Sequence, residues 1–126
     1  VNPDAPEAES VQKVFDEMGR ISGRPWVMLS AGASAENFLK VLQYAYRAGA
    51  SGFLAGRAIW WESFVQNFPD IVQMQKVLAH DGVKYMREIN DLSTQHANPW
   101  TNHPLHASGV QMQYSTQDFA RLYSDF

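Results

Sequence analysis

The sequence predicts a parallel α/β fold, and the order of its apolar segments is the main observation behind this prediction. Two short, continuous apolar runs, residues 26–29 and 52–55, each follow a segment of helical periodicity and end at a glycine-containing turn. Such runs are typical of strands buried on both faces of a parallel sheet, and helix–strand–helix–strand order with tight connections is the pattern of α/β units. A complete eight-stranded α/β barrel takes about 250 residues. The chain has 126 residues and two convincing strands, so we expect a fragment of a larger barrel.

The first segment has the period of an amphipathic helix. From Glu7 onward its apolar residues recur at spacings of three and four, with charged residues between them: Val11, Val14, Phe15, Met18 and Ile21. The predicted helix ends before Gly23 and Pro25, because glycine accepts a left-handed cap and proline disfavours helix in the residue before it.

A second helix is predicted between the two apolar runs. Ser34 is a suitable N-cap residue, and Arg47 and Gly49 mark the exit of the helix. Its apolar side consists of Phe38, Leu39, Val41, Leu42, Ala45 and Tyr46.

The rest of the chain is predicted to be mostly helical and then irregular. Residues 59–93 have helical character with a break at residues 67–70, where Asp70 is placed to cap a longer stretch from residue 71 to residue 92. Residues 93–104 are polar and helix-breaking. A short helix is predicted for residues 116–126, with Phe119, Leu122 and Tyr123 on one side.

Composition and charge exclude several classes of protein. The chain has no cysteine, which excludes disulfides, thiolate-bound metal centres and thiol catalysis, and which fits a reducing cytoplasm. A net charge of −3, with neither sign gathered in a block, argues against a nucleic-acid partner. No apolar stretch approaches the ~20 residues that cross a bilayer. The acidic, proline-bearing N-terminus is the opposite of a secretory leader, so we expect neither a leader nor a membrane partner.

Small and polar residues follow both predicted strands. Ser30, Ala31 and Gly32 come directly after the first strand, and Gly56 and Arg57 directly after the second. Ligands of parallel α/β folds bind at this carboxyl end of the strands. A phosphate needs closely approaching backbone N–H groups, hence glycine, together with a hydroxyl and a cation, and an arginine fork can bond two of its oxygens. In the alternative interpretation the glycines only make tight turns and Arg57 is solvated; the occurrence of both turns, one helix apart, favours a phosphate site.

Two segments taken together resemble a known family. They are residues 26–32, Trp-Val-Met-Leu-Ser-Ala-Gly, and residues 48–60, Ala-Gly-Ala-Ser-Gly-Phe-Leu-Ala-Gly-Arg-Ala-Ile-Trp. These are similar to the strand 7 to strand 8 region of tagatose 1,6-bisphosphate aldolase-like enzymes, which are class I aldolases on a (β/α)8 TIM barrel. The resemblance covers about residues 1–100 and implies the C-terminal portion of such a barrel there, about strands 7 and 8 with their helices. Residues 101–126 would then be a mostly helical or irregular C-terminal tail.

The resemblance also implies roles for individual residues. In the family the two loops grip a substrate phosphate, which implies that role for Ser30, Ala31, Gly32, Gly56 and Arg57. The family's Schiff-base lysine sits on strand 6, so it is expected upstream of Val1, and no residue of this chain is expected to be catalytic. The lysines that are present fall within predicted helices rather than at a strand end: Lys13, Lys40, Lys76 and Lys84.

Three further groups of side chains invite a functional interpretation, and a structural one is favoured for each. The histidines of the polar segment lack a carboxylate cluster, so we expect solvated side chains and no metal site: His96, His103 and His106. The aromatic residues after Arg57 are expected in the core or an interface rather than stacked on a sugar or base: Trp60, Trp61, Phe64 and Phe68. Glu62 alone is weak evidence for a site.

These observations lead to two hypotheses about function. In the first, the chain is the phosphate-binding C-terminal segment of a cytoplasmic class I aldolase that cleaves a ketose phosphate such as tagatose 1,6-bisphosphate without a cofactor, and it is inactive alone. In the second, it is a non-catalytic phosphate-binding or oligomerisation module that covers its strand edges by self-association. The expected partners are a sugar phosphate and either another copy or the missing N-terminal part of the barrel. A lysine-bearing strand encoded just upstream of Val1 would support the aldolase, and a start codon there would support the module.

Overall fold

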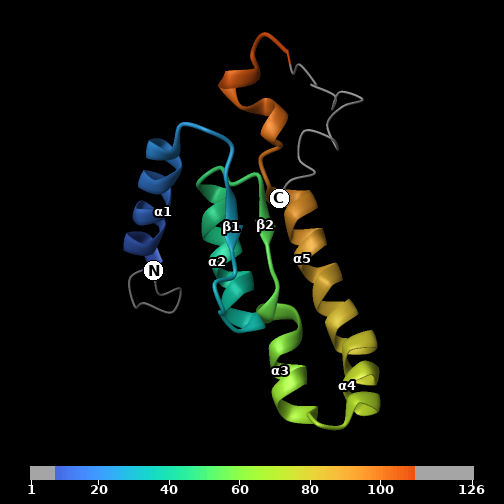
Figure 1. Ribbon diagram of the computed structural model, residues 1–126. Coiled ribbons are helices and arrows are strands. Elements are labelled where there is room, and N and C mark those ends of the chain that lie inside the picture. The colour runs from blue at the N-terminus through green and yellow to red at the C-terminus, as the bar shows by residue number, and fades with distance from the viewer. Residues whose placement is uncertain (1–7, 110–126) are drawn as a thin grey trace, which may run out of the picture.

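A computed structural model describes residues 8–109 of the chain (Figure 1). The described elements are α1 (Ala8–Ser22), β1 (Val27–Leu29), α2 (Ala35–Arg47), β2 (Gly52–Leu54), α3 (Arg57–Asn67), α4 (Ile71–Val77), a π-helical turn (Leu78–Gly82), α5 (Val83–His96) and two 3-10 turns (Trp100–Asn102 and Pro104–His106). The short helix predicted for residues 116–126 lies outside the described residues.

The two strands form a parallel sheet, as predicted. Val27 lies opposite Gly52 and Leu29 opposite Leu54. A backbone hydrogen bond at each end extends the ladder, one of them from the Ser30 amide to the Leu54 carbonyl at 3.0 Å. In Figure 1 both strands run downward, so the turns that follow them meet at the lower end of the sheet, next to α3.

α2 begins, and both α1 and α2 end, where the sequence predicts. The Ser34 hydroxyl accepts a hydrogen bond from the Asn37 amide at 3.3 Å, which caps the start of α2. α1 ends just before Gly23, whose φ of +59° is the left-handed conformation that glycine accepts. Gly19 of α1 faces α2 so closely that a Cβ at this position would collide with the carbonyl oxygen of Ala48. Both predicted helices are therefore confirmed. The absence of a side chain at Gly19 allows α1 to approach the end of α2 closely.

A single core lies between the helices and one face of the sheet. Its largest fully buried side chains come from α1, α2 and α5: Phe15, Phe38, Leu42 and Ile89. Met28 of β1 and Phe53 of β2 pack against this core, and Phe53 meets Phe38 edge to face at 6.3 Å between ring centroids. The apolar stripe predicted for α2 lies in this core or packs against it, whereas Val14 and Ile21 of the stripe predicted for α1 are 51% and 64% exposed.

The opposite face of the sheet is exposed, so the prediction of strands buried on both faces is wrong for the described residues. Val27, Leu29 and Leu54 point away from the core and are 42%, 56% and 60% exposed. α2 lies behind the two strands in Figure 1, and none of the helices of residues 8–109 covers the other face. Successive side chains of a strand alternate between faces, so a helix layer on one side leaves every second residue in water.

Residues 71–96 form one continuous helical stretch that is longer than predicted. The Asp70 carboxylate accepts a hydrogen bond from the Gln73 amide at 2.9 Å, which confirms the predicted cap. The helix ends at His96 rather than near residue 92, because the hydroxyls of Ser93 and Thr94 donate to carbonyls one turn earlier instead of ending the helix. No helix among the described residues is long and apolar enough to cross a membrane.

Candidate functional site

The turn after β1 has an unusual backbone. Ala31 and Gly32 both have positive φ, +48° and +86°, and the Ala33 amide donates to the Ser30 carbonyl at 2.8 Å. Positive φ at both central residues is the pattern of a type I′ turn, and it is unfavourable for alanine. Ser30 itself is 8% exposed, since its amide continues the sheet. Ala31 and Gly32 are exposed, next to a buried serine.

The turn after β2 places a cation against this backbone. Gly56 precedes the first residue of α3, which is Arg57. A Cβ built on Gly32 would stand 3.2 Å from Nη2 and 3.3 Å from Cζ of Arg57, so the guanidinium lies against the bare face of that glycine. Within residues 8–109 this exposed guanidinium has no hydrogen bond or ion pair. No residue of that range therefore occupies its donors.

Both turns line one hollow of about 390 Å³ at the carboxyl ends of the strands, which we call the strand-end hollow. All five predicted phosphate-binding residues lie in its lining, together with one tryptophan of α3 and three apolar residues at the ends of the strands: Leu29, Ser30, Ala31, Gly32, Leu54, Ala55, Gly56, Arg57 and Trp60. Backbone amides beside a guanidinium that no described residue pairs with form an environment suited to an anion. The structure thus brings the predicted residues together at the expected end of the sheet.

Of two side chains near the strand-end hollow, sequence reasoning assigned Trp60 to packing and did not single out Tyr85. Trp60 stands one helical turn after Arg57, and this i, i+3 spacing places both on the same side of α3, a signal that the sequence contains. Tyr85 of α5 donates its hydroxyl to the carbonyl of Ala35 at 2.8 Å, just after the first turn. Tyr85 and Ala35 are 50 positions apart, and no local sequence pattern indicates their contact.

A buried tyrosine, Tyr46, and a partly buried one, Tyr85, have perturbed ionisation. Burial raises the pKa of Tyr85 to about 12, with a further contribution from the negative charge of Glu88. Burial also raises the pKa of Tyr46, opposed by its hydrogen bond with Ser93, whose oxygen is 2.6 Å away. Both hydroxyls therefore remain protonated at neutral pH and serve as hydrogen-bond partners between α2 and α5.

The four lysines lie on helices, as predicted. Lys13 and Lys40 pair with glutamates one turn earlier at 3.0 Å, and Lys84 is 4.0 Å from Glu88. Lys76 is exposed on α4. None of the four lines the strand-end hollow.

The aromatic residues of α3 are not in the core, so that part of the prediction is wrong. They pack on one another, with ring centroids 5.2 to 6.1 Å apart between neighbours: Trp60, Trp61, Phe64 and Phe68. Trp60, Trp61 and Phe68 nevertheless remain 40%, 49% and 60% exposed. α3 extends below the sheet and beyond the core in Figure 1, so little within residues 8–109 covers it. Glu62 on the same helix is exposed and accepts a hydrogen bond from Gln66 at 3.0 Å.

The histidines of the polar segment do not converge. His103 accepts a hydrogen bond from the Leu105 amide at 3.2 Å, and His106 meets the ring of Trp100 edge to face. In the described part of the chain no group of three or more histidine, aspartate or glutamate side chains is arranged to hold a metal ion.

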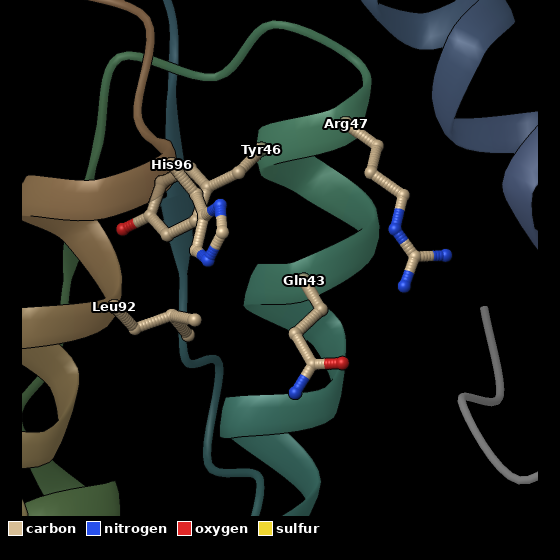
Figure 2. A pocket seen from close by; sticks show the side chains of 5 residues that line it. All are labelled: Gln43, Tyr46, Arg47, Leu92 and His96. Atoms are coloured by element: carbon tan, nitrogen blue, oxygen red, sulfur yellow. The ribbon is translucent and has the colours of Figure 1, made fainter.

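A second hollow, of about 400 Å³, lies between α2 and the end of α5 (Figure 2). Its lining is Gln43, Tyr46, Arg47, Leu92 and His96. In Figure 2 the side chain of Arg47 points away from His96, and it lies over the ring of Tyr44 with Cζ 5.5 Å from the centroid. The polar side chains of Arg47 and His96 therefore do not face a common point in this hollow.

Comparison with known proteins finds relatives of the segment that contains both turns. Residues 3–62 match the family described as DeoC/LacD family aldolase. Tagatose 1,6-diphosphate aldolase 1 of Streptococcus pyogenes is 36% identical over 100 residues, which is 75% of this chain and 30% of the relative. Tagatose 1,6-diphosphate aldolase 2 of Streptococcus mutans is 35% identical over 97 residues, 74% of this chain and 29% of the relative.

The chain therefore spans about 30% of the length of the curated relatives that it matches. The residues matched by the family include both strands and all five residues of the two turns. The resemblance stated from the motifs is confirmed: residues 3–62 of this chain belong to the DeoC/LacD aldolase family.

Proposed function

We propose that this chain supplies the phosphate-binding loops of a class I aldolase that cleaves a ketose phosphate. The substrate class follows from the relatives, whose name specifies tagatose 1,6-diphosphate. A cysteine-free composition fits a reducing cytoplasm as the place of the reaction. The proposal concerns a longer protein, since the chain matches about 30% of each relative.

One observation carries the proposal: the guanidinium of Arg57, which pairs with none of residues 8–109, lies against Gly32 in the strand-end hollow. Arginine can donate two parallel hydrogen bonds to phosphate oxygens, and the missing side chain at Gly32 lets an anion reach both backbone and guanidinium. The buried Ser30 lies at the base of the turn, where its hydroxyl can serve the same anion. The hollow is therefore complementary in charge and donor set to a phosphate group.

Phosphate binding contributes to catalysis by positioning. A phosphate held at the strand ends fixes the reacting ketone beside an amine nucleophile, which removes translational and rotational entropy from the barrier. In a class I reaction a lysine amine attacks that ketone, water leaves, and the resulting iminium accepts the electron pair of the breaking carbon–carbon bond. None of the four lysines lines the strand-end hollow, so we assign the amine to a segment outside residues 1–126.

Titration of the 126-residue chain with inorganic phosphate tests the proposal. Saturable NMR shifts of the Gly32 and Gly56 amides and of the Arg57 side-chain N–H are expected. Arg57→Ala should weaken the binding strongly, whereas Arg24→Ala should not, since Arg24 is exposed in the connection before β1, away from the carboxyl ends of the strands. No response of these groups, or an equal response in the Arg57 variant, would refute the assignment.

The exposed apolar face of the sheet favours a second candidate, a phosphate-binding module that assembles with itself. Val27, Leu29 and Leu54 lie together on this face. A short parallel sheet with an uncovered apolar face and open edges is stabilised by pairing with further strands, either from another copy or from the rest of a barrel. The segment encoded upstream of Val1 distinguishes these sources: a strand bearing a lysine supports the aldolase.

A further inference from the structure

Tyr85 connects the start of α5 to the start of α2, which follows the turn after β1. Its hydroxyl donates to the carbonyl of Ala35, the first residue of α2, at 2.8 Å. Its ring packs against the core and borders a space of about 410 Å³ that Ala35 and Ala58 also line. Ala58 directly follows Arg57. One side chain thus stands beside the segments that follow both turns.

An irregularity in the helix just before Tyr85 sets the direction of its side chain toward Ala35. Between α4 and α5, residues 78–82 form a π-helical turn, in which the Val83 amide bonds to the Leu78 carbonyl five residues earlier. The extra residue rotates the side chains that follow it by roughly 100° about the helix axis, because an α-helix turns that much per residue. Gly82 is buried in this turn, with Leu78 packed 3.4 Å from where a Cβ would stand. In a regular helix through this segment the direction of Tyr85 would differ by that angle from its direction toward Ala35, and π-turns of this kind are frequent at functional sites.

We propose that Tyr85 is a positioning residue of the phosphate site, which holds the carbonyl of Ala35 and thereby keeps the turn of residues 30–33 in place against Arg57. The role rests on the proposed function. Ser34 alone separates Ala35 from this turn; the Ala33 amide closes the turn by donating to the Ser30 carbonyl, and Ser34 caps the helix that Ala35 begins. Fixing the turn before a ligand arrives reduces the ordering cost of binding. Tyr85 does not line the strand-end hollow, so it acts on the turn through Ala35.

The chain contains a matched control for this role. Tyr46 also joins α2 to α5, through its hydrogen bond with Ser93 at 2.6 Å, and its hydroxyl is likewise part-buried. It lies in the last turn of α2, at the opposite end from the strand-end hollow. Tyr85→Phe and Tyr46→Phe therefore remove the same group between the same two helices, but only one of them acts next to the turn.

The test uses the 126-residue chain and inorganic phosphate. Phosphate affinity is measured by NMR titration, and amide hydrogen exchange is measured without phosphate for the wild type and both variants. Tyr85→Phe should weaken phosphate binding about two- to tenfold, the range expected for one neutral hydrogen bond, and should speed exchange at the amides of residues 31–36. Tyr46→Phe should leave both quantities near the wild-type values, even where it lowers thermal stability as much.

The outcomes separate this role from the proposed function. A wild type that fails to bind phosphate overturns the proposed function and, with it, the role of Tyr85 in binding. A wild type that binds, with an equal change or none in the two tyrosine variants, overturns the positioning role alone. Faster exchange confined to residues 31–36 together with weaker binding in Tyr85→Phe supports it.

Discussion

Arg57 and Gly32, which are 25 positions apart in the sequence, lie so close that a single methyl group at Gly32 would stand 3.2 Å from the Arg57 guanidinium. The contact joins the turn after β1 to the first residue of α3. It depends on the parallel pairing of the strands, which brings their carboxyl ends to the same edge of the sheet. The absence of a side chain at position 32 is therefore a feature of the site as well as of the turn.

Gly32→Ala should lower phosphate affinity, because its Cβ displaces Arg57 and the strained turn shifts. Gly49→Ala is the control: Gly49 has a φ of +88°, against +86° at Gly32, but nothing within 4 Å of its Cβ position. Both variants should lose about 1–2 kcal/mol of unfolding free energy through left-handed strain. Phosphate titration and chemical denaturation are the measurements, and an equal affinity in both variants would contradict the contact's role.

Arg57→Ala should reduce kcat/KM for a phosphorylated ketose in a longer protein that contains this chain and the lysine-bearing strand. Hydrogen bonds to charged groups contribute roughly 1.5–3 kcal/mol each, so the expected loss is about tenfold to thousandfold. The thermal midpoint without ligand should move little, because Arg57 has no hydrogen bond or ion pair within residues 8–109. Added phosphate should stabilise the wild type more than the variant. Unchanged kinetics would mean that Arg57 is simply solvated.

The 126-residue chain alone should show no retro-aldol activity and should form no borohydride-trapped adduct with a ketose phosphate. Iminium formation at neutral pH requires an amine of lowered pKa in a desolvated place, whereas Lys13 and Lys84 have side chains that are 72% exposed and Lys40 is paired with Glu36. Mass spectrometry after reduction is the measurement. A trapped adduct mapped to any of the four lysines would contradict the assignment of the amine to another segment.

Stability should fall at high pH as Tyr85 ionises. Its pKa is raised from 10.0 to about 12 by burial and by Glu88, so the folded state holds this proton more tightly than the unfolded state. The contribution is fully present below pH 10.0 and is lost as the pH rises toward about 12. Tyrosinate absorbance and denaturation at several pH values are the measurements. Tyr85→Phe should lack this part of the decline, and an identical pH profile in the variant would show that Tyr85 does not cause it.

Self-association of the isolated chain should depend on the exposed sheet face. Leu54→Thr keeps a strand-forming, β-branched residue but removes apolar surface from a position that is 60% exposed, so it should shift the chain toward the monomer in sedimentation experiments. Val14→Thr changes a residue that is 51% exposed on α1, away from this face, and should have no such effect. Equal behaviour of the two variants would exclude the sheet face as the association surface.

The sequence by itself determined the local elements and the end of the sheet at which the candidate site lies. The caps at Ser34 and Asp70 are formed by a residue and a backbone amide three positions later, so their signals are local and the structure reproduces them. The two apolar runs, separated by one helix, specified parallel pairing, and parallel pairing placed Ser30 and Arg57 at the same edge.

Tertiary structure alone decided what covers each surface and what holds the turns. An apolar run has the same composition whether one or both faces of its strand are buried, so the exposure of Val27, Leu29 and Leu54 depended on the number of layers. The reach of α5 to His96, the π-turn before Val83 and the hydrogen bond from Tyr85 to Ala35 depended on how two distant helices pack. The physical reason is the distance along the sequence over which each interaction acts. Capping and periodicity act within a few residues, whereas burial and long-range hydrogen bonds form only when separate elements pack together.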